Sequence, residues 1–112
     1  MADSVVRVCG KAEIGPETVK AFEVGDLRLA VYNIGGEFHV TDDECTHASA
    51  SLADGILDGD IIECAVHCGA FNVRTGAVEA PPCLVPLRTY KVVLRGDDIF
   101  ADLDRNAAGE PA

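Results

Sequence analysis

The chain has 112 residues, of which 48 % are apolar and 25 % are charged, as expected for one folded domain. Nine Lys and Arg stand against nineteen Asp and Glu, and the formal charge of −10 argues against nucleic acid and anionic membranes as partners. The apolar runs are far too short to cross a membrane and the first residues lack a secretory leader, so we expect a cytoplasmic protein.

Short runs rich in β-branched and aromatic residues recur along the chain, with turn residues between them. Turn residues separate two such runs at three places: Gly35-Gly36, Asp58-Gly59 and the segment 74–76. This pattern predicts three hairpins in a small all-β sandwich or barrel. We expect one domain at residues 1–104 and a flexible tail at 105–112. The predicted strand regions are VVRVC (5–9), VKAFEV (19–24), LRLAVYNI (27–34), EFHVT (37–41), GILDGDIIEC (55–64), FNV (71–73), AVEA (77–80), LRTYKVVL (87–94) and IFADL (99–103).

A cysteine and a histidine stand close together twice, as Cys45 with His47 and as Cys64 with His67. These four side chains provide the ligands for one tetrahedral zinc, or for a [2Fe–2S] cluster with two Cys on one iron and two His on the other. A third interpretation is that these are ordinary loop histidines beside buried cysteines. The chain has only three His, however, and two of them fall within three residues of a Cys. Zinc sites usually pair Cys with Cys and His with His, whereas each loop here mixes the two, which favours the cluster.

The spacing C-x-H followed by C-x-x-H resembles the Rieske motif, and the resemblance extends over about residues 5–103. The stretch GILDGDIIEC and the later GAFNVRTG are similar to the stand-alone Rieske-type ferredoxins of bacterial aromatic-ring-hydroxylating dioxygenase systems. This resemblance implies an all-β Rieske domain of three small antiparallel sheets, with two cluster-binding loops at one tip.

The same resemblance implies which residues hold the cluster. Cys45 and Cys64 would ligate the inner iron of one [2Fe–2S] cluster, and His47 and His67 would ligate the outer iron near the surface. A loop containing Pro81 and Pro82 would cover the cluster.

Four further positions indicate which kind of Rieske protein this is. High-potential members have a second cysteine in each loop, where this chain has Ala50 and Val66, so that disulfide is not expected. They also have Ser and Tyr donors to the sulfurs, where this chain has Gly69 and Phe71. Fewer hydrogen bonds to sulfur lower the potential, so we expect the low end of the Rieske range, about −150 mV.

The resemblance therefore implies a monomeric one-electron carrier that is not itself an enzyme. Its partners would be an NAD(P)H-dependent flavoprotein or iron–sulfur reductase and a terminal ring-hydroxylating oxygenase. The alternatives are a Rieske-like small subunit of another oxidoreductase, of the nitrite-reductase type, and a zinc-stabilised binding module.

The acidic residues near the two loops predict a surface that steers basic partners, although an acidic surface also serves solubility alone. We expect Cys9 and Cys83 to be small buried residues, His39 to be a strand residue, and Cys68 not to be a ligand, since the ligand set is complete without it. The candidates for the acidic rim are Asp42, Asp43, Glu44, Asp54, Asp58 and Asp60.

Overall fold

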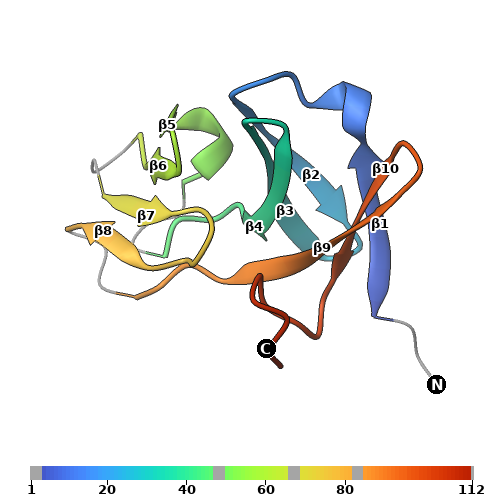
Figure 1. Ribbon diagram of the computed structural model, residues 1–112. Helices are drawn as coiled ribbons and strands as arrows, with labels where there is room; N and C mark the ends of the chain where they lie inside the picture. The colour runs from blue at the N-terminus through green and yellow to red at the C-terminus, as the bar shows by residue number, and fades with distance from the viewer. Residues whose placement is uncertain (1–3, 47–49, 66–68, 82–84, 112) are drawn as a thin grey trace.

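The computed structural model describes residues 4–46, 50–65, 69–81 and 85–111, and the predicted all-β fold is confirmed (Figure 1). In these ranges the only helical segments are two single 3-10 turns, η1 (Lys11–Glu13) and η2 (Leu52–Asp54). Within the same ranges, no helix has the length and apolar character that a bilayer crossing needs. The strands described are β1 (Val5–Gly10), β2 (Thr18–Val24), β3 (Leu27–Ile34), β4 (Glu37–Asp42), β5 (Ile56–Asp58), β6 (Ile61–Glu63), β7 (Ala70–Asn72), β8 (Val78–Ala80), β9 (Thr89–Arg95) and β10 (Asp98–Asp102).

The strands form two antiparallel sheets, which lie beside each other in Figure 1. The larger sheet has the order β1-β10-β9-β4-β3-β2, and the smaller sheet has the order β5-β6-β7-β8. The resemblance implies three small sheets, and in the structure two of them are joined where β4 pairs with β9 through Val40↔Tyr90 and Thr41↔Thr89.

The three predicted hairpins form, and glycines at their turns explain two of them. Gly35 and Gly36 have φ of 60° and 87° and connect β3 to β4, as a two-residue hairpin turn requires. Gly59, with φ of 58°, lies in the turn between β5 and β6. The third hairpin joins β7 to β8 through the segment 73–77.

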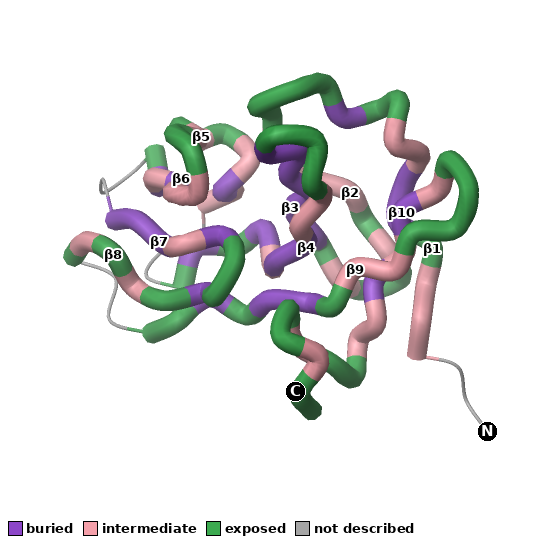
Figure 2. The backbone as a smooth tube through the Cα atoms, viewed as in Figure 1, coloured by how far each residue is buried: buried purple, intermediate pink, exposed green. Residues whose placement is uncertain are grey.

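The core consists of two clusters that lie on opposite faces of β3, which is why this strand is buried along most of its length (Figure 2). Ala30, Tyr32 and Ile34 belong to the cluster shared with the small sheet. Leu29 and Val31 belong to the cluster enclosed by the larger sheet. Successive side chains of a strand point to opposite faces, so one strand contributes to both clusters.

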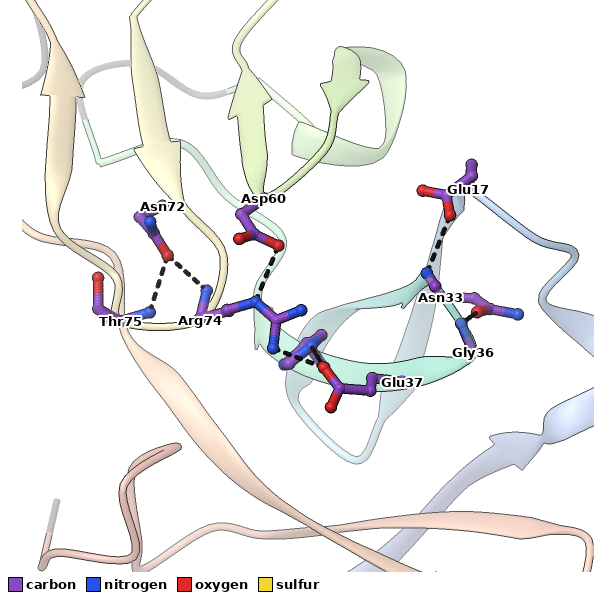
Figure 3. Close-up of polar contacts among 10 residues, drawn as sticks. Glu17, Asn33, Gly36, Glu37, Asp60, Asn72, Arg74 and Thr75 are labelled. Carbon is purple, nitrogen blue, oxygen red and sulfur yellow. Dashed lines mark hydrogen bonds and ion pairs between the residues drawn. The ribbon is translucent and has the colours of Figure 1, made fainter.

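Arg74 connects the two sheets at the end of the small sheet where β5 turns into β6 (Figure 3). Its Nε donates to Asp60 Oδ1 (2.8 Å), and its Nη1 donates to Glu37 Oε1 (2.6 Å) at the start of β4. The side chain of Asn72 fixes the turn between β7 and β8 that carries Arg74, because its Oδ1 accepts hydrogen bonds from the backbone N–H groups of Arg74 (2.9 Å) and Thr75 (3.2 Å). The partner Arg74 lowers the pKa of Glu37 below its usual value.

The segment 105–111 folds back on β9. Lys91 donates its backbone N–H to the carbonyl of Arg105 (3.0 Å), and the N–H of Ala107 donates to the hydroxyl of Thr89 (3.0 Å). The flexibility expected of this tail stays a prediction.

Candidate metal centre

The first Cys/His loop rises from a short ladder that continues β4. The backbone N–H of Cys45 donates to the carbonyl of Ala50 (2.9 Å), and the N–H of Leu52 donates to the carbonyl of Asp43 (2.7 Å). Glu44 and Ser51 form a bridge between these two bonds. The chain therefore leaves the ladder at Cys45 and returns to it at Ala50. His47, the other predicted ligand of this loop, lies outside the described residues.

The second loop is closed by the same kind of bond. It connects β6 to β7, whose last pair is Glu63↔Ala70, and the N–H of Cys64 donates to the carbonyl of Gly69 (2.7 Å). In both loops, then, the cysteine donates to the carbonyl five residues later. His67 also lies outside the described residues, as does Cys68.

The fold brings the two cysteines into the same buried layer. Cys45 is 3 % exposed and Cys64 is 0 % exposed, and both belong to the cluster that contains Leu52, Ile62 and Phe71. Two sulfur donors are thereby shielded from water at the base of loops that each carry a histidine. This donor set fits an iron–sulfur cluster, for which cysteine thiolates and an apolar surrounding are suitable.

A third segment lies beside the first loop. Ala80, the last residue of β8, pairs with Ala70, the residue of β7 at which the second loop ends. The hydroxyl of Thr46 donates to the carbonyl of Val85 (2.8 Å), so the chain after β8 returns next to Cys45. Pro81 is exposed, whereas Pro82 and Cys83 lie outside the described residues. The predicted covering loop thus joins Pro81, which follows β8, to Val85, which contacts Thr46 of the first loop.

Two glycines permit close backbone contacts, and one of these contacts lies next to the second loop. A Cβ on Gly55 would collide with the carbonyl oxygen of Glu63, the residue before Cys64. A Cβ on Gly76, whose φ is 80°, would collide with the carbonyl of Leu87. The first contact sets how closely the chain entering β5 approaches the end of β6.

The predicted acidic rim needs one clear correction, because Asp43 is 0 % exposed. Its Oδ2 accepts hydrogen bonds from Arg28 Nε (2.7 Å) and Ser51 Oγ (2.6 Å), and its Oδ1 accepts one from the N–H of Ala53 (3.0 Å). The bond to Asp43 raises the pKa of the Arg28 guanidinium above its ordinary value. Sequence reasoning missed Arg28 and Ser51, since only the pairing of β3 with β4 and the bridge between Glu44 and Ser51 reveal that they converge on this carboxylate.

Two other rim candidates also have partners. Asp42 accepts a hydrogen bond from the Tyr90 hydroxyl (2.6 Å), and Asp60 pairs with Arg74. Burial, followed by the bond to Asp42, raises the pKa of Tyr90. Glu44, Asp54 and Asp58 are the exposed acids of the predicted set.

The remaining predictions for side chains are mostly confirmed. Cys9 is 1 % exposed, and burial raises the pKa of its thiol to about 11, which keeps it protonated. His39 lies in β4, and burial lowers its pKa. Phe71 is fully buried in the cluster that also contains Cys64, and it offers no hydrogen-bond donor.

Known proteins resemble this chain in both sequence and structure. The Rieske [2Fe-2S] domain family matches residues 4–91. The ferredoxin component of biphenyl 2,3-dioxygenase from Rhodococcus jostii (strain RHA1) is 42 % identical over 101 residues, covering 90 % of this chain and 94 % of the relative. A Sphingomonas yanoikuyae B1 ferredoxin superposes with a TM-score of 0.84 and 42 % identity, covering 87 % of this chain and 96 % of that one.

A chain from the complex of reduced oxygenase and oxidised ferredoxin in carbazole 1,9a-dioxygenase superposes with a TM-score of 0.83 and 39 % identity, covering 99 % of this chain and 98 % of that one. These matches favour iron–sulfur over zinc chemistry. Because the family match spans most of a chain whose two loop cysteines are buried together, the protein belongs to the Rieske [2Fe-2S] domain family and carries one Rieske-type [2Fe–2S] cluster.

Proposed function

We propose that this protein is the one-electron carrier of an aromatic-ring-hydroxylating dioxygenase system and is not an enzyme by itself. It accepts an electron from an NAD(P)H-dependent reductase and passes it to the terminal oxygenase. The observation that carries this proposal is the nearly end-to-end match with ferredoxin components of such systems. We further propose that it acts as a monomer in the cytoplasm, where a reducing environment preserves thiolate ligands.

Four residues are proposed to hold the cluster: Cys45 and Cys64 on the inner iron, and His47 and His67 on the outer iron. When bound, the cluster supplies a site that gains and loses one electron. The chain keeps water from both sulfur positions, because both cysteines are buried. The matching N–H to carbonyl bonds close the two loops at their bases and fix where each cysteine leaves the ladder.

A low reduction potential fits the role of donor to an oxygenase. Phe71 is buried in the cluster that contains Cys64 and offers no donor, and Gly69 has no side chain. Hydrogen bonds to the sulfurs would stabilise the added electron, so the lack of a side-chain donor at Gly69 and Phe71 favours the oxidised state.

Three exposed acids of the predicted rim, Glu44, Asp54 and Asp58, are proposed to attract basic patches on both partners. The rate of reduction by the reductase should therefore fall steeply with added salt. A rate that stays flat between low and high salt would show that this surface serves only solubility.

The first experiment is the visible and EPR spectrum of the purified protein before and after dithionite. We expect a broad absorption that bleaches, and a signal of the reduced protein that averages below the free-electron g value. The substitutions Cys64→Ser and His67→Asn should abolish or alter these spectra, while the matched controls Cys9→Ser and His39→Asn, and Cys68→Ser, should leave them intact. A colourless protein with stoichiometric zinc would refute the proposal.

The second experiment tests the role of the protein in the chain of electron transfer. The reduced protein is mixed with the terminal oxygenase, and its reoxidation is followed by stopped-flow absorbance. Reoxidation should be fast and should support product formation with NAD(P)H and the reductase. Ring hydroxylation that proceeds at the same rate without this chain would refute the carrier role.

A further inference from the structure

The buried carboxylate of Asp43 lies two residues before Cys45 and is hydrogen-bonded on both oxygens. Its side chain is 0 % exposed, whereas the side chain of its ion-pair partner Arg28 is 55 % exposed. Buried carboxylates are seldom found without such partners, since removing a charge from water is costly. The ion pair therefore has one partner inside the protein and one that reaches solvent.

Asp43 ties together three parts of the chain at the base of the first loop. Its backbone N–H donates to the carbonyl of Arg28 in β3 (3.0 Å), and its carbonyl accepts from the N–H of Leu52 (2.7 Å). Its side chain reaches Ser51 (2.6 Å) and the N–H of Ala53 (3.0 Å) on the returning arm. Any movement of Asp43 would be passed to both arms of the loop, and so to the point where Cys45 leaves the ladder.

The charges of this pair have opposite effects on an electron added nearby. A guanidinium favours added negative charge, and a carboxylate opposes it. Contact at 2.7 Å makes the two effects largely offset each other beneath the loop. Charges and hydrogen bonds outside the ligand set are known to tune the potentials of such centres.

We propose that Arg28 and Asp43 form a charge-balanced positioning pair that holds the first cluster loop and keeps the buried charge of Asp43 from lowering the reduction potential of the cluster. The inference rests on the proposed ligands, in particular on Cys45. Removing the guanidinium leaves an unbalanced buried carboxylate and makes reduction harder. Neutralising the carboxylate leaves an unbalanced guanidinium and makes reduction easier.

The test measures the midpoint potential of the holoprotein for wild type, Arg28→Gln, Asp43→Asn and the double variant. At a fixed electrode potential, we expect the ratio of reduced to oxidised protein to fall at least threefold in Arg28→Gln and to rise at least threefold in Asp43→Asn. A threefold change corresponds to about 28 mV for a one-electron couple, at 59 mV per tenfold. The double variant should return to within twofold of wild type.

The matched controls are Arg7→Gln and Asp98→Asn, which change the same charges in the exposed Arg7–Asp98 pair (3.1 Å) between β1 and β10. These should shift the ratio by less than twofold. The variant Arg28→Lys keeps the charge and should retain the wild-type potential, while its EPR signal broadens because the Nε hydrogen bond to Asp43 is lost.

Shifts of the same sign in both single variants, or shifts no larger than those of the controls, would overturn the proposal. If Asp43→Asn does not fold, Arg28→Gln against Arg28→Lys and Arg7→Gln decides the question, and an unshifted Arg28→Gln overturns it. A wild-type protein without the Rieske spectrum would instead refute the proposed function, so the two failures are distinguishable.

Discussion

Gly55 offers a direct test of how tightly the small sheet is built beside Cys64. Its φ of −86° is acceptable to any residue, so replacing it with alanine introduces no backbone strain. The added Cβ would nevertheless collide with the carbonyl oxygen of Glu63 and lie 3.1 Å from the carbonyl oxygen of Leu52. Both are backbone atoms, which cannot rotate away as a flexible side chain does.

The expected cost of Gly55→Ala is about 3 kcal/mol, the upper end of the usual range for overpacking, because backbone must move. Gly59 in the same hairpin provides the matched control. It has φ of 58° and nothing within 4 Å of an added Cβ, so Gly59→Ala pays only for the left-handed conformation. That cost is about 1 kcal/mol after the reduced entropy of the unfolded chain is subtracted.

The assay follows denaturation of the oxidised holoprotein in guanidinium by far-UV circular dichroism, together with the rate at which the visible absorption bleaches. Gly55→Ala should unfold at lower denaturant than Gly59→Ala and should bleach faster, because Glu63 directly precedes Cys64. Equal stabilities of the two variants, or a more stable Gly55→Ala, would show that the end of β6 is not held by this contact.

Three further predictions concern packing, a hydrogen bond and pH. Leu52→Ala should lower the free energy of unfolding by about 2 to 5 kcal/mol in denaturant titrations, because Leu52 is fully buried in the cluster that holds Cys45 and Cys64. A loss below about 1 kcal/mol would contradict this packing. Tyr90→Phe removes the 2.6 Å bond to Asp42 and should cost about 1.5 kcal/mol by the same measurement, whereas an unchanged midpoint would mean that water replaces the hydroxyl at no cost. The pKa of Glu37 is lowered from 4.5 by Arg74, so its contribution is present above pH 4.5 and is lost as the pH falls through the lower folded value. Thermal melts of Glu37→Gln should therefore show a weaker decline of stability below pH 4.5 than wild type, and an identical decline would exclude this ion pair as a source.

Turn chemistry and side-chain alternation made much of the fold predictable from the sequence. Gly35-Gly36 permits the positive φ values that a two-residue hairpin needs, and the flanking β-branched runs supply the strands. The joining of two sheets through Val40↔Tyr90 was not predictable, because this pairing connects residues far apart in the chain and leaves no local pattern.

The candidate site divides in a similar way. The Cys and His spacing identified the loops, since metal ligands must be of particular types at short separations. The acidic run Asp42-Asp43-Glu44 predicts a surface position for Asp43, because solvation is the ordinary expectation for such a run. Its burial depends on Arg28 and Ser51, which approach it from other segments, and sequence order does not show that convergence.

The position of β3 between the two core clusters has a consequence for how the molecule opens. If the small sheet detached by itself, Ala30, Tyr32 and Ile34 would be exposed to water on one face of β3. Exposing a large apolar side chain such as Ile34 costs about 1.5 to 3 kcal/mol, so detachment of the small sheet is opposed on this face. Leu29 and Val31 oppose opening on the other face in the same way. Amide protons along β3 should then exchange with solvent only when the whole domain unfolds. The small sheet and the larger sheet would thus unfold together as one cooperative unit, with β3 as its slowest-exchanging strand.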